Sequence, residues 1–244
     1  MAEWKRKRVW SSVEVRPLGN GYGVFLDGRP ATTPAGAELI APVRPLAKRI
    51  AAEWQAQTGT IDPALMPVTR LANAAIDKIG PQSEAVAGML AAYGGSDLIC
   101  YRADGPPALS ERQTRAWTPL LDWAAEALDA RLHPTQGVMF QAQPENSLSA
   151  LRARVGGMTG FELAAFHDLV VLSGSLILAF AVTRGRLRAE TAWDISRIDE
   201  DWQSEHWGED EEARAAATAK KAAFLLAAET FRLLSNPASD TPNG

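Results

Sequence analysis

The sequence predicts an α+β protein, with a small N-terminal α/β domain of antiparallel hairpins and a covering helix, followed by a larger all-helical domain. Two observations predict this class. Short runs separated by glycine-containing turns fill the first forty residues, and helical periodicity begins at Pro42 and continues almost to the C-terminus. We expect the α/β domain over 1–62, the helical domain over 63–235 and a disordered tail over 236–244.

The N-terminal strands are predicted from the segment SSVEVRPLGNGYGVFLDGRPATT, which spans residues 11–33. Gly19-Asn20-Gly21 separates the first two runs, and Asp27-Gly28 makes a second turn. Asn-Gly and Asp-Gly favour hairpin turns because the central positions need a positive φ. The spaced glycines precede a strand and not a helix, which excludes a dinucleotide-binding fingerprint.

The covering helix is predicted over RPLAKRIAAEWQAQ, residues 44–57. Leu46, Ile50 and Trp54 recur every four residues and form one apolar stripe that can cover a small sheet. Trp54 is open to two interpretations, a core anchor or a binding hot spot, and its spacing favours the core anchor.

Further helices follow along the chain. Asp62-Pro63 is a favourable helix start for an apolar stripe that runs from Val68 to Ile79. Ser110 and Gln113 predict a capping box ahead of Trp117, and Pro119 is expected to kink or restart that helix.

The C-terminal half predicts three more helical segments. Residues 161–182 are expected to form one apolar central helix that ends near Gly185. A segment from Glu190 to about His206 follows. Apolar residues at spacings of three and four then predict a long last helix over 213–234.

Composition excludes several classes of function. The net charge of −4 gives no electrostatic case for binding nucleic acid. Cys100 is the only cysteine, which excludes a disulfide framework and a cysteine-based zinc cluster. The longest uncharged run, Leu169–Val182, is shorter than the roughly 20 residues that span a bilayer. With no secretory signal, we expect a cytoplasmic protein.

Catalytic and metal-binding motifs are missing from the sequence, so the residues by themselves predict no metal site. Asp199 and Asp201 could begin an EF-hand, but Ser204 occupies the sixth position, where the loop needs glycine. His167-Asp168 is either a catalytic dyad or a polar pair at the rim of a core. We favour the polar pair, because no oxyanion hole or metal ligand lies nearby.

The acidic stretch DEDWQSEHWGEDEE, residues 199–212, needs a separate explanation. Trp207-Gly208 is typical of a helix end, and residues 209–212 suit the first turn of the next helix, where the helix dipole favours negative charge. Helix ends do not explain why Trp202 and Trp207 lie among carboxylates. Aromatic anchors beside charges are typical of a protein-docking surface.

Several segments together resemble one family, the assembly chaperones that hold the α subunit of the catalytic sector of F-type ATP synthase. The segments are VFLDGRPATTP, LAKRIAAEWQAQTGTIDPALMPVTRLANAAIDKI, DLICYRADGP, ERQTRAWTPLLDWA, LSGSLILAFAV and DEDWQSEHWGEDEEA. They follow the family's order and cover the chain from about Arg8 to Phe231. The long block that begins in LAKRIAAEWQ makes the match specific.

The resemblance implies a chaperone that binds an unassembled α subunit, hides its interface from aggregation and releases it when the β subunit takes that place. It also implies a protein that is not an enzyme and has no cofactor, and we expect the chain to be monomeric alone. The partner-binding residues that we expect are Glu53, Trp54, Trp202, Glu205, Trp207, Glu209, Asp210 and Glu211. Replacing Glu205, Glu209 and Glu211 by alanine should weaken capture of α and leave the melting temperature nearly unchanged.

The chain departs from the family pattern in three places. Arg8-Val9-Trp10-Ser11 replaces an Arg-aromatic-aromatic-Lys start, and Glu212 and Arg214 stand where mitochondrial members have an aromatic residue and a histidine. No mitochondrial transit extension precedes the domain, so we expect a bacterial cytoplasmic protein. Two alternatives stay open. One is a small-molecule hydrolase or transferase that uses the interdomain cleft, and the other is a general holdase without a fixed client.

Overall fold

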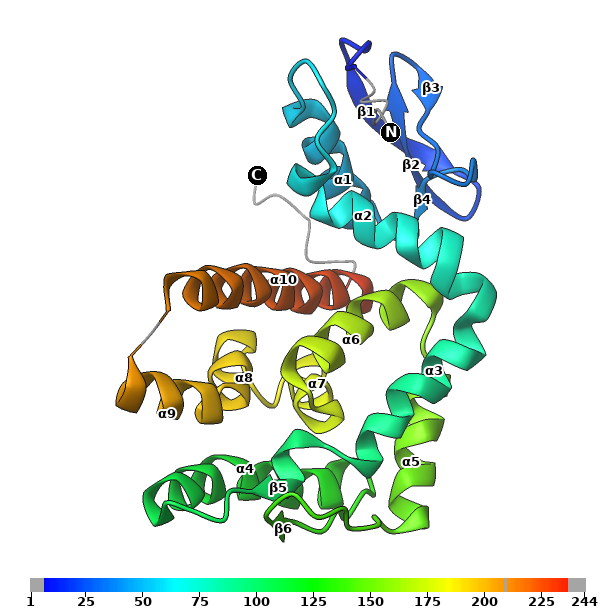
Figure 1. Ribbon diagram of the computed structural model, residues 1–244. Helices are drawn as coiled ribbons and strands as arrows, with labels where there is room; N and C mark the ends of the chain where they lie inside the picture. Colours follow the sequence, from blue (N-terminus) through cyan, green and yellow to red (C-terminus); the bar gives the residue numbers. More distant parts are fainter. Residues whose placement is uncertain (1–6, 209, 237–244) are drawn as a thin grey trace, which may run out of the picture. The chain divides into compact units, whose positions relative to one another are not determined.

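The computed structural model describes residues 7–208 and 210–236, which group into two compact units (Figure 1). The first contains the described residues up to Gln82, together with Thr159–Ala164 and the chain from Glu229 onward. The second contains Ser83–Met158 and Ala165–Ala228. The predicted fold class is confirmed, because a small sheet occupies the N-terminal region and helices dominate the rest.

The sheet of the first unit is built on a hairpin of β1 (Val13–Leu18) and β2 (Gly21–Leu26), which pair antiparallel. Two short strands, β3 (Arg29–Pro30) and β4 (Ile40–Ala41), also pair with β2. The turn at Asp27-Gly28 has the positive φ angles that the sequence predicted, 46° and 78°.

The first hairpin turn differs from the prediction in one residue. Leu18 pairs with Gly21, so the loop consists of Gly19 and Asn20, and Gly19 carries the positive φ of 54°. Gly21 belongs to β2 and not to the turn. A side chain at Gly21 would clash with the Ala41 carbonyl of β4, so the glycine is needed here for close strand approach.

Helix α1 (Arg44–Ala56) covers the sheet and packs on β1 and β2 as predicted. Leu46, Ala47 and Ile50 are fully buried. The Asp62 carboxylate accepts a hydrogen bond from the Ala64 amide at 2.9 Å, but this caps only a 3-10 turn (Pro63–Leu65). Helix α2 (Pro67–Ala74) begins after it and continues into a π-helical turn (Ala75–Ile79).

The first unit extends beyond the boundary that the sequence predicted between residues 62 and 63. Helix α2 packs on α1, which places residues 63–82 with the N-terminal sheet. Of the predicted tail, only Asn236 is described, and its amide donates to the Arg232 carbonyl at 3.0 Å. Residues 237–244 lie outside the described part of the chain.

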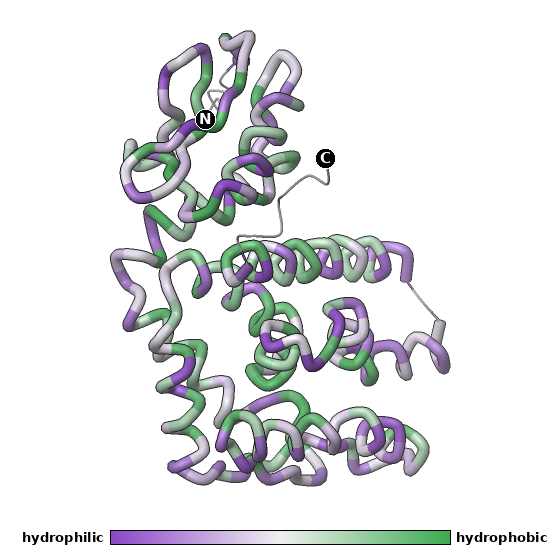
Figure 2. Tube along the Cα trace, turned by 180° about the vertical axis from the view of Figure 1, so that it is seen from behind, coloured by the Kyte–Doolittle hydropathy of each residue, from purple (hydrophilic) through white to green (hydrophobic). Residues whose placement is uncertain are grey.

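The remaining elements complete the chain in order. They are α3 (Ser83–Ala92), β5 (Tyr101–Arg102), α4 (Pro107–Ala127), β6 (Thr135–Gln136), α5 (Glu145–Gly156), α6 (Gly160–Ser173), α7 (Leu176–Thr183), α8 (Ala189–Ser196), α9 (Ile198–Trp207) and α10 (Glu211–Ser235). Strands β5 and β6 pair in parallel. Along α10, hydrophobic and hydrophilic colours alternate (Figure 2), and Phe224, Ala227 and Phe231 form its buried face.

The predicted single helix over residues 161–182 was wrong, because Gly174 separates α6 from α7. Gly174 has a φ of 70°, which a continuous helix cannot accommodate. The Ser175 hydroxyl then accepts a hydrogen bond from the Leu178 amide at 3.0 Å and begins α7 as its N-cap. Gly185, with a φ of 69°, follows the end of α7 as predicted.

Two further helix predictions need correction. Helix α4 begins at Pro107, so Ser110 and Gln113 lie inside it and form no capping box, and the helix continues through Pro119 without a restart. The segment predicted from Glu190 to His206 is two helices, α8 and α9, separated at Arg197. Within the described residues, no helix combines the length and apolar content that crossing a membrane requires.

Candidate functional site

Glu53 projects from α1 and satisfies the start of α2. Its carboxylate accepts hydrogen bonds from the Val68 amide, the Thr69 amide and the Thr69 hydroxyl, each at 2.7 Å. The first amides of a helix have no partner within the helix, and Met66, the N-cap residue of α2, supplies no side-chain cap. Glu53, which lies on α1, therefore supplies the cap that α2 lacks. Both oxygens of its carboxylate already accept hydrogen bonds from α2.

Trp54, beside Glu53, is half-buried and packs edge-on against Trp10 with ring centroids 5.1 Å apart. Arg8 lies over the Trp10 ring at 5.6 Å and donates to the carbonyls of Gln55 and Gln57 at 2.9 and 2.6 Å. These contacts fasten the segment before β1 to the end of α1. The Trp54 ring thus serves the packing of the first unit.

The predicted residues of α9 have different environments. Trp202 is half-buried and stacks on His206 with ring centroids 4.3 Å apart. Glu205 accepts hydrogen bonds from Nη1 of Arg112, on α4, at 2.8 and 3.0 Å. Trp207 is 79% exposed and therefore packs on little of the protein. Gly208, with a φ of 84°, ends α9 as predicted.

The acidic residues after Gly208 lead into α10. Asp210 is exposed, and its carboxylate accepts a hydrogen bond from the Glu212 amide at 3.4 Å. Glu211 is exposed and lies 4.0 Å from Arg214. Carboxylates at this helix start are favoured by the helix dipole. Glu209, which the sequence also predicted as a partner-binding residue, lies outside the described residues.

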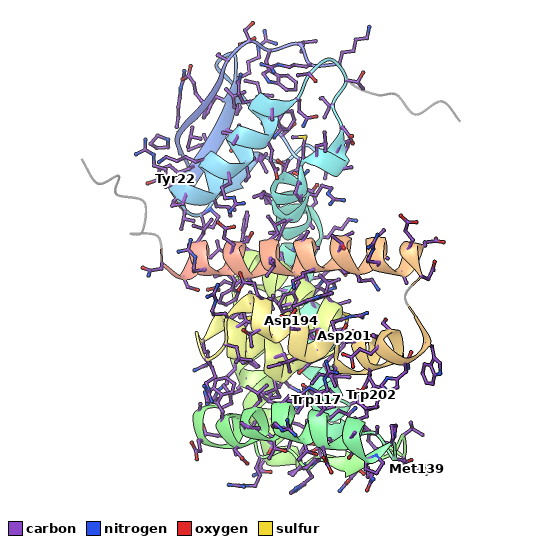
Figure 3. The ribbon with its side chains drawn as sticks, turned by 90° about the vertical axis from the view of Figure 1, so that its left-hand side faces the viewer. Tyr22, Trp117, Met139, Asp194, Asp201 and Trp202 are labelled. Atoms are coloured by element: carbon purple, nitrogen blue, oxygen red, sulfur yellow. The ribbon has the colours of Figure 1, made fainter. Side chains whose placement is uncertain are left out.

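A hollow of about 540 Å³ lies between α8, α9 and the start of α10. Its lining includes Trp193, Asp194, Arg197, Glu200, Asp201, Gln203, Trp207, Asp210 and Lys221. Figure 3 labels Asp194 and Asp201, which contribute from neighbouring helices. Two predicted residues, Trp207 and Asp210, line this hollow, whereas Trp202, Glu205 and Glu211 do not.

Some charged side chains that line the hollow form ion pairs, and others do not. Arg197 pairs with Glu200 at 2.6 Å, and Lys221 pairs with Asp194 at 2.9 Å. Among the described residues, Asp201 and Asp210 make no ion pair within 4 Å. Partial burial raises the pKa of Asp201, since a carboxylate removed from water holds its proton more tightly. The hollow thus combines two carboxylates that have no ion-pair partner among the described residues with the exposed indole of Trp207.

Asp194 and Lys221 were not predicted from the sequence as site residues. Lys221 lies on α10, and its position opposite α8 depends on packing between these helices, where the rings of Trp193 and Phe224 are 5.7 Å apart. The helical spacing along α10 predicts that Phe224 lies on the buried face of the helix. It does not predict which other helix Phe224 contacts. No local pattern could have placed Lys221 in the hollow.

Several other titratable side chains lie outside this hollow. His167 Nδ1 lies 3.0 Å from the Asp168 carboxylate, and both side chains are over a third exposed, which fits the favoured polar pair. Burial raises the pKa of Asp97 to about 6, but Asp97 does not line this hollow. Burial likewise raises the pKa of the Cys100 thiol. Within the described chain, no three His, Cys, Asp or Glu side chains group as a metal site.

Comparison with known proteins gives matches over nearly the whole chain. The family model described as ATP12 chaperone protein matches residues 7–125. The mitochondrial protein atp12 of Schizosaccharomyces pombe is 25% identical over 219 residues, which cover 85% of this chain and 75% of that protein.

Solved structures agree with these matches. The crystal structure of Atp12 from Paracoccus denitrificans superposes with a TM-score of 0.91 at 50% identity, covering 95% of this chain and 99% of that one. A protein of Agrobacterium tumefaciens superposes with a TM-score of 0.86 at 41% identity, covering 92% and 84% of the two chains. This chain belongs to the ATP12 chaperone family.

Proposed function

We propose that this chaperone binds the unassembled α subunit of the F-type ATP synthase catalytic sector, protects it from aggregation and hands it to the β subunit. The observation that carries the proposal is the match to Atp12 of Paracoccus denitrificans at 50% identity over nearly both chains. The higher identity to a bacterial relative than to the mitochondrial one supports action in a bacterial cytoplasm.

The chemistry of such a client sets what the chaperone must offer. An unassembled subunit exposes an oligomer interface that is apolar and prone to association. A chaperone that is later displaced needs moderate affinity, which a mixed aromatic and charged surface provides better than a large apolar one. The α9–α10 surface, defined here as Asp201, Glu205, Trp207, Asp210 and Glu211, has this mixed character.

The predicted residues divide between two roles in this proposal. Trp207, Asp210 and Glu211 contact the client directly, since their side chains are exposed. Trp202 stiffens α9 through its stacking on His206. Glu53 and Trp54 act indirectly, because their contacts hold α2 and the segment before β1 in place.

The first test is co-expression of this chain with the ATP synthase α and β subunits of the same bacterium, each alone and then together. We expect α alone to be retained in a pull-down and β to release it. Retention of neither subunit would overturn the proposal. Equal retention of an unrelated chemically unfolded enzyme would replace the dedicated chaperone with a general holdase.

The second test asks whether the α9–α10 surface carries the contact. Trp207→Ala combined with Asp210→Asn and Glu211→Gln should reduce retained α about tenfold, since exposed aromatic anchors dominate binding energy. The matched control is Asp122→Asn with Glu126→Gln, which removes two exposed carboxylates from α4 of the same unit. Equal losses in both variants would show a general charge effect and not a defined surface.

A further inference from the structure

The loop between β6 and α5 exposes three consecutive large apolar residues. Val138 is 94% exposed, Met139 is 78% exposed and Phe140 is 72% exposed. Single exposed apolar side chains are normal on a soluble protein, but a contiguous group marks a contact surface. We call Val138, Met139 and Phe140 the apolar loop.

The apolar loop projects from a base that hydrogen bonds hold at both ends. The Gly137 amide donates to the Arg102 carbonyl at 2.8 Å, which extends the pairing of β5 with β6. At the other end the buried Gln143 side chain accepts from the His133 amide at 2.7 Å and donates to the His133 carbonyl at 3.0 Å. A held base lowers the entropy lost when a partner binds, so the loop is well prepared for docking.

A second hollow joins the apolar loop to α9. It measures about 310 Å³, and its lining includes Gly137 and Val138 from the loop, Leu109 and Gln113 from α4, and Asp199 and Gln203 from α9. Gln203 also lines the first hollow. Figure 3 labels Met139 of the loop and Trp202 of α9, both in the lower right part of the view. Gln203 is therefore shared by the two hollows, and the apolar loop lies beside α9, the helix that carries part of the α9–α10 surface.

We propose that the apolar loop is the apolar half of the client-binding face, whose acidic half is the α9–α10 surface. The occupant is an exposed apolar interface of an unassembled subunit, with basic side chains beside it. This inference rests on the proposed function and specifies which surface of the client is recognised. Apolar side chains supply contact area, and the unpaired carboxylates of Asp201 and Asp210 select a basic neighbour.

Charge argues against a second copy of this chain as the occupant. A two-fold contact pairs identical surfaces, so a dimer through this face would bring the carboxylates of one α9–α10 surface near those of the other. Like charges placed together across an interface oppose association. Basic side chains on a different partner would be attracted to the same carboxylates. Met139 adds adaptability, since an unbranched thioether side chain fits varied apolar surfaces.

The test replaces all three residues of the apolar loop in the full chain, as Val138→Ser, Met139→Ser and Phe140→Ser. The amount of α subunit retained after co-expression should fall about tenfold. The midpoint of thermal unfolding should stay near the wild-type value, because the replaced side chains are exposed. The matched control is Val9→Ser with Leu65→Ser, at positions 87% and 68% exposed in the first unit.

The outcomes separate this inference from the proposed function. Unchanged retention of α by the triple variant overturns the inference and leaves the proposed function standing. A wild-type chain that retains no α overturns the proposed function, and the inference with it. An equal loss in the control variant overturns the inference by showing unspecific apolar capture. Sedimentation velocity tests whether the loop binds a second copy of the chain. If the wild type is a dimer and the triple variant is a monomer, the loop is a dimer contact, and this result also overturns the inference.

Discussion

Two places where a tryptophan lies beside carboxylates, one in each unit, differ in which contacts satisfy these side chains. In the first unit, the Glu53 carboxylate accepts three hydrogen bonds and Trp54 packs on Trp10. In the second, Trp207 is 79% exposed and Asp201 and Asp210 lack ion pairs among the described residues. The same residue types therefore hold the fold together in one region and remain exposed in the other.

The difference follows from what each segment joins. Glu53 lies where one helix must supply the missing cap of another, so its negative charge is used inside the fold. Trp207 ends a helix at Gly208, beyond which the chain turns toward α10. A ring at a helix terminus has few neighbours to cover it. The satisfied pair should thus govern stability, and the unsatisfied group should govern binding.

The largest expected loss of stability comes from replacing Trp54, the tryptophan that packs on Trp10. Trp54→Ala should lower the free energy of unfolding by about 3 kcal/mol, since it removes the ring that contacts Trp10 and leaves a cavity. Urea unfolding followed by circular dichroism measures it. Trp207→Ala, at the exposed ring, should change the same quantity by less than about 0.5 kcal/mol. Similar losses at the two positions would break the comparison.

A smaller loss is expected at the capping carboxylate. Glu53→Ala should lower the free energy of unfolding by about 2 kcal/mol, because two α2 amides and the Thr69 hydroxyl lose their acceptor. Glu53→Gln is the matched control, which keeps the side-chain length and one acceptor oxygen and should lose less. The assignment fails if Glu53→Ala reduces capture of α but leaves urea unfolding unchanged.

Asp97 extends the comparison to a capping carboxylate that is fully buried. It accepts hydrogen bonds from the Ser175 hydroxyl at 2.6 Å and the Ile177 amide at 3.0 Å, yet burial raises its pKa to about 6 from an ordinary 3.8. The folded chain binds this proton more tightly than the unfolded chain does. The stability from this proton is therefore fully present below about pH 4 and is lost as the pH rises through about 6.

The measurement compares the wild type with Asp97→Asn in urea unfolding between pH 4 and pH 7. Over this window the wild type should lose on the order of 2 kcal/mol relative to the variant. The variant has no proton to release at this position, so other titrating groups cancel in the difference. Parallel pH profiles for the two proteins would show that Asp97 does not titrate in this range.

The smallest effect on stability is expected at the ion pair between α4 and α9. Arg112 and Glu205 are 39% and 51% exposed, so their coupling energy should be below about 1 kcal/mol. A double-mutant cycle with Arg112→Gln and Glu205→Gln measures it. A coupling well above this limit would move Glu205 from the binding group to the structural group and sharpen the division between the two regions.

Local features were predictable because short segments decide them. The turn at Asp27-Gly28 and the helix ends near Gly185 and Gly208 require positive φ, which glycine and a few polar residues supply at low cost. The break at Gly174 was missed although Ser173, Gly174 and Ser175 were visible. Their apolar neighbours continue a helical pattern on both sides, and periodicity alone does not show a change of direction.

Contacts across long sequence separations were not predictable in the same way. Glu53 reaches α2 over fifteen residues, and Arg112 reaches Glu205 over ninety-three. The apolar loop was missed for a related reason, since three apolar residues in sequence are as consistent with a buried strand as with an exposed loop. Only the tertiary structure shows that Val138 lies beside Asp199 and Gln203 of α9 and Leu109 and Gln113 of α4.

By itself the sequence determined the fold class, several glycine-containing turns and helix ends, and the family, because these depend on residue types at fixed spacing along the chain. The tertiary structure decided which of the predicted residues are satisfied within the fold and which remain exposed. A carboxylate or an indole has the same chemistry everywhere, and its role depends on whether distant segments supply hydrogen-bond donors and packing partners. Other segments of the chain provide such partners for Glu53 and Trp54 but leave Trp207 exposed to solvent.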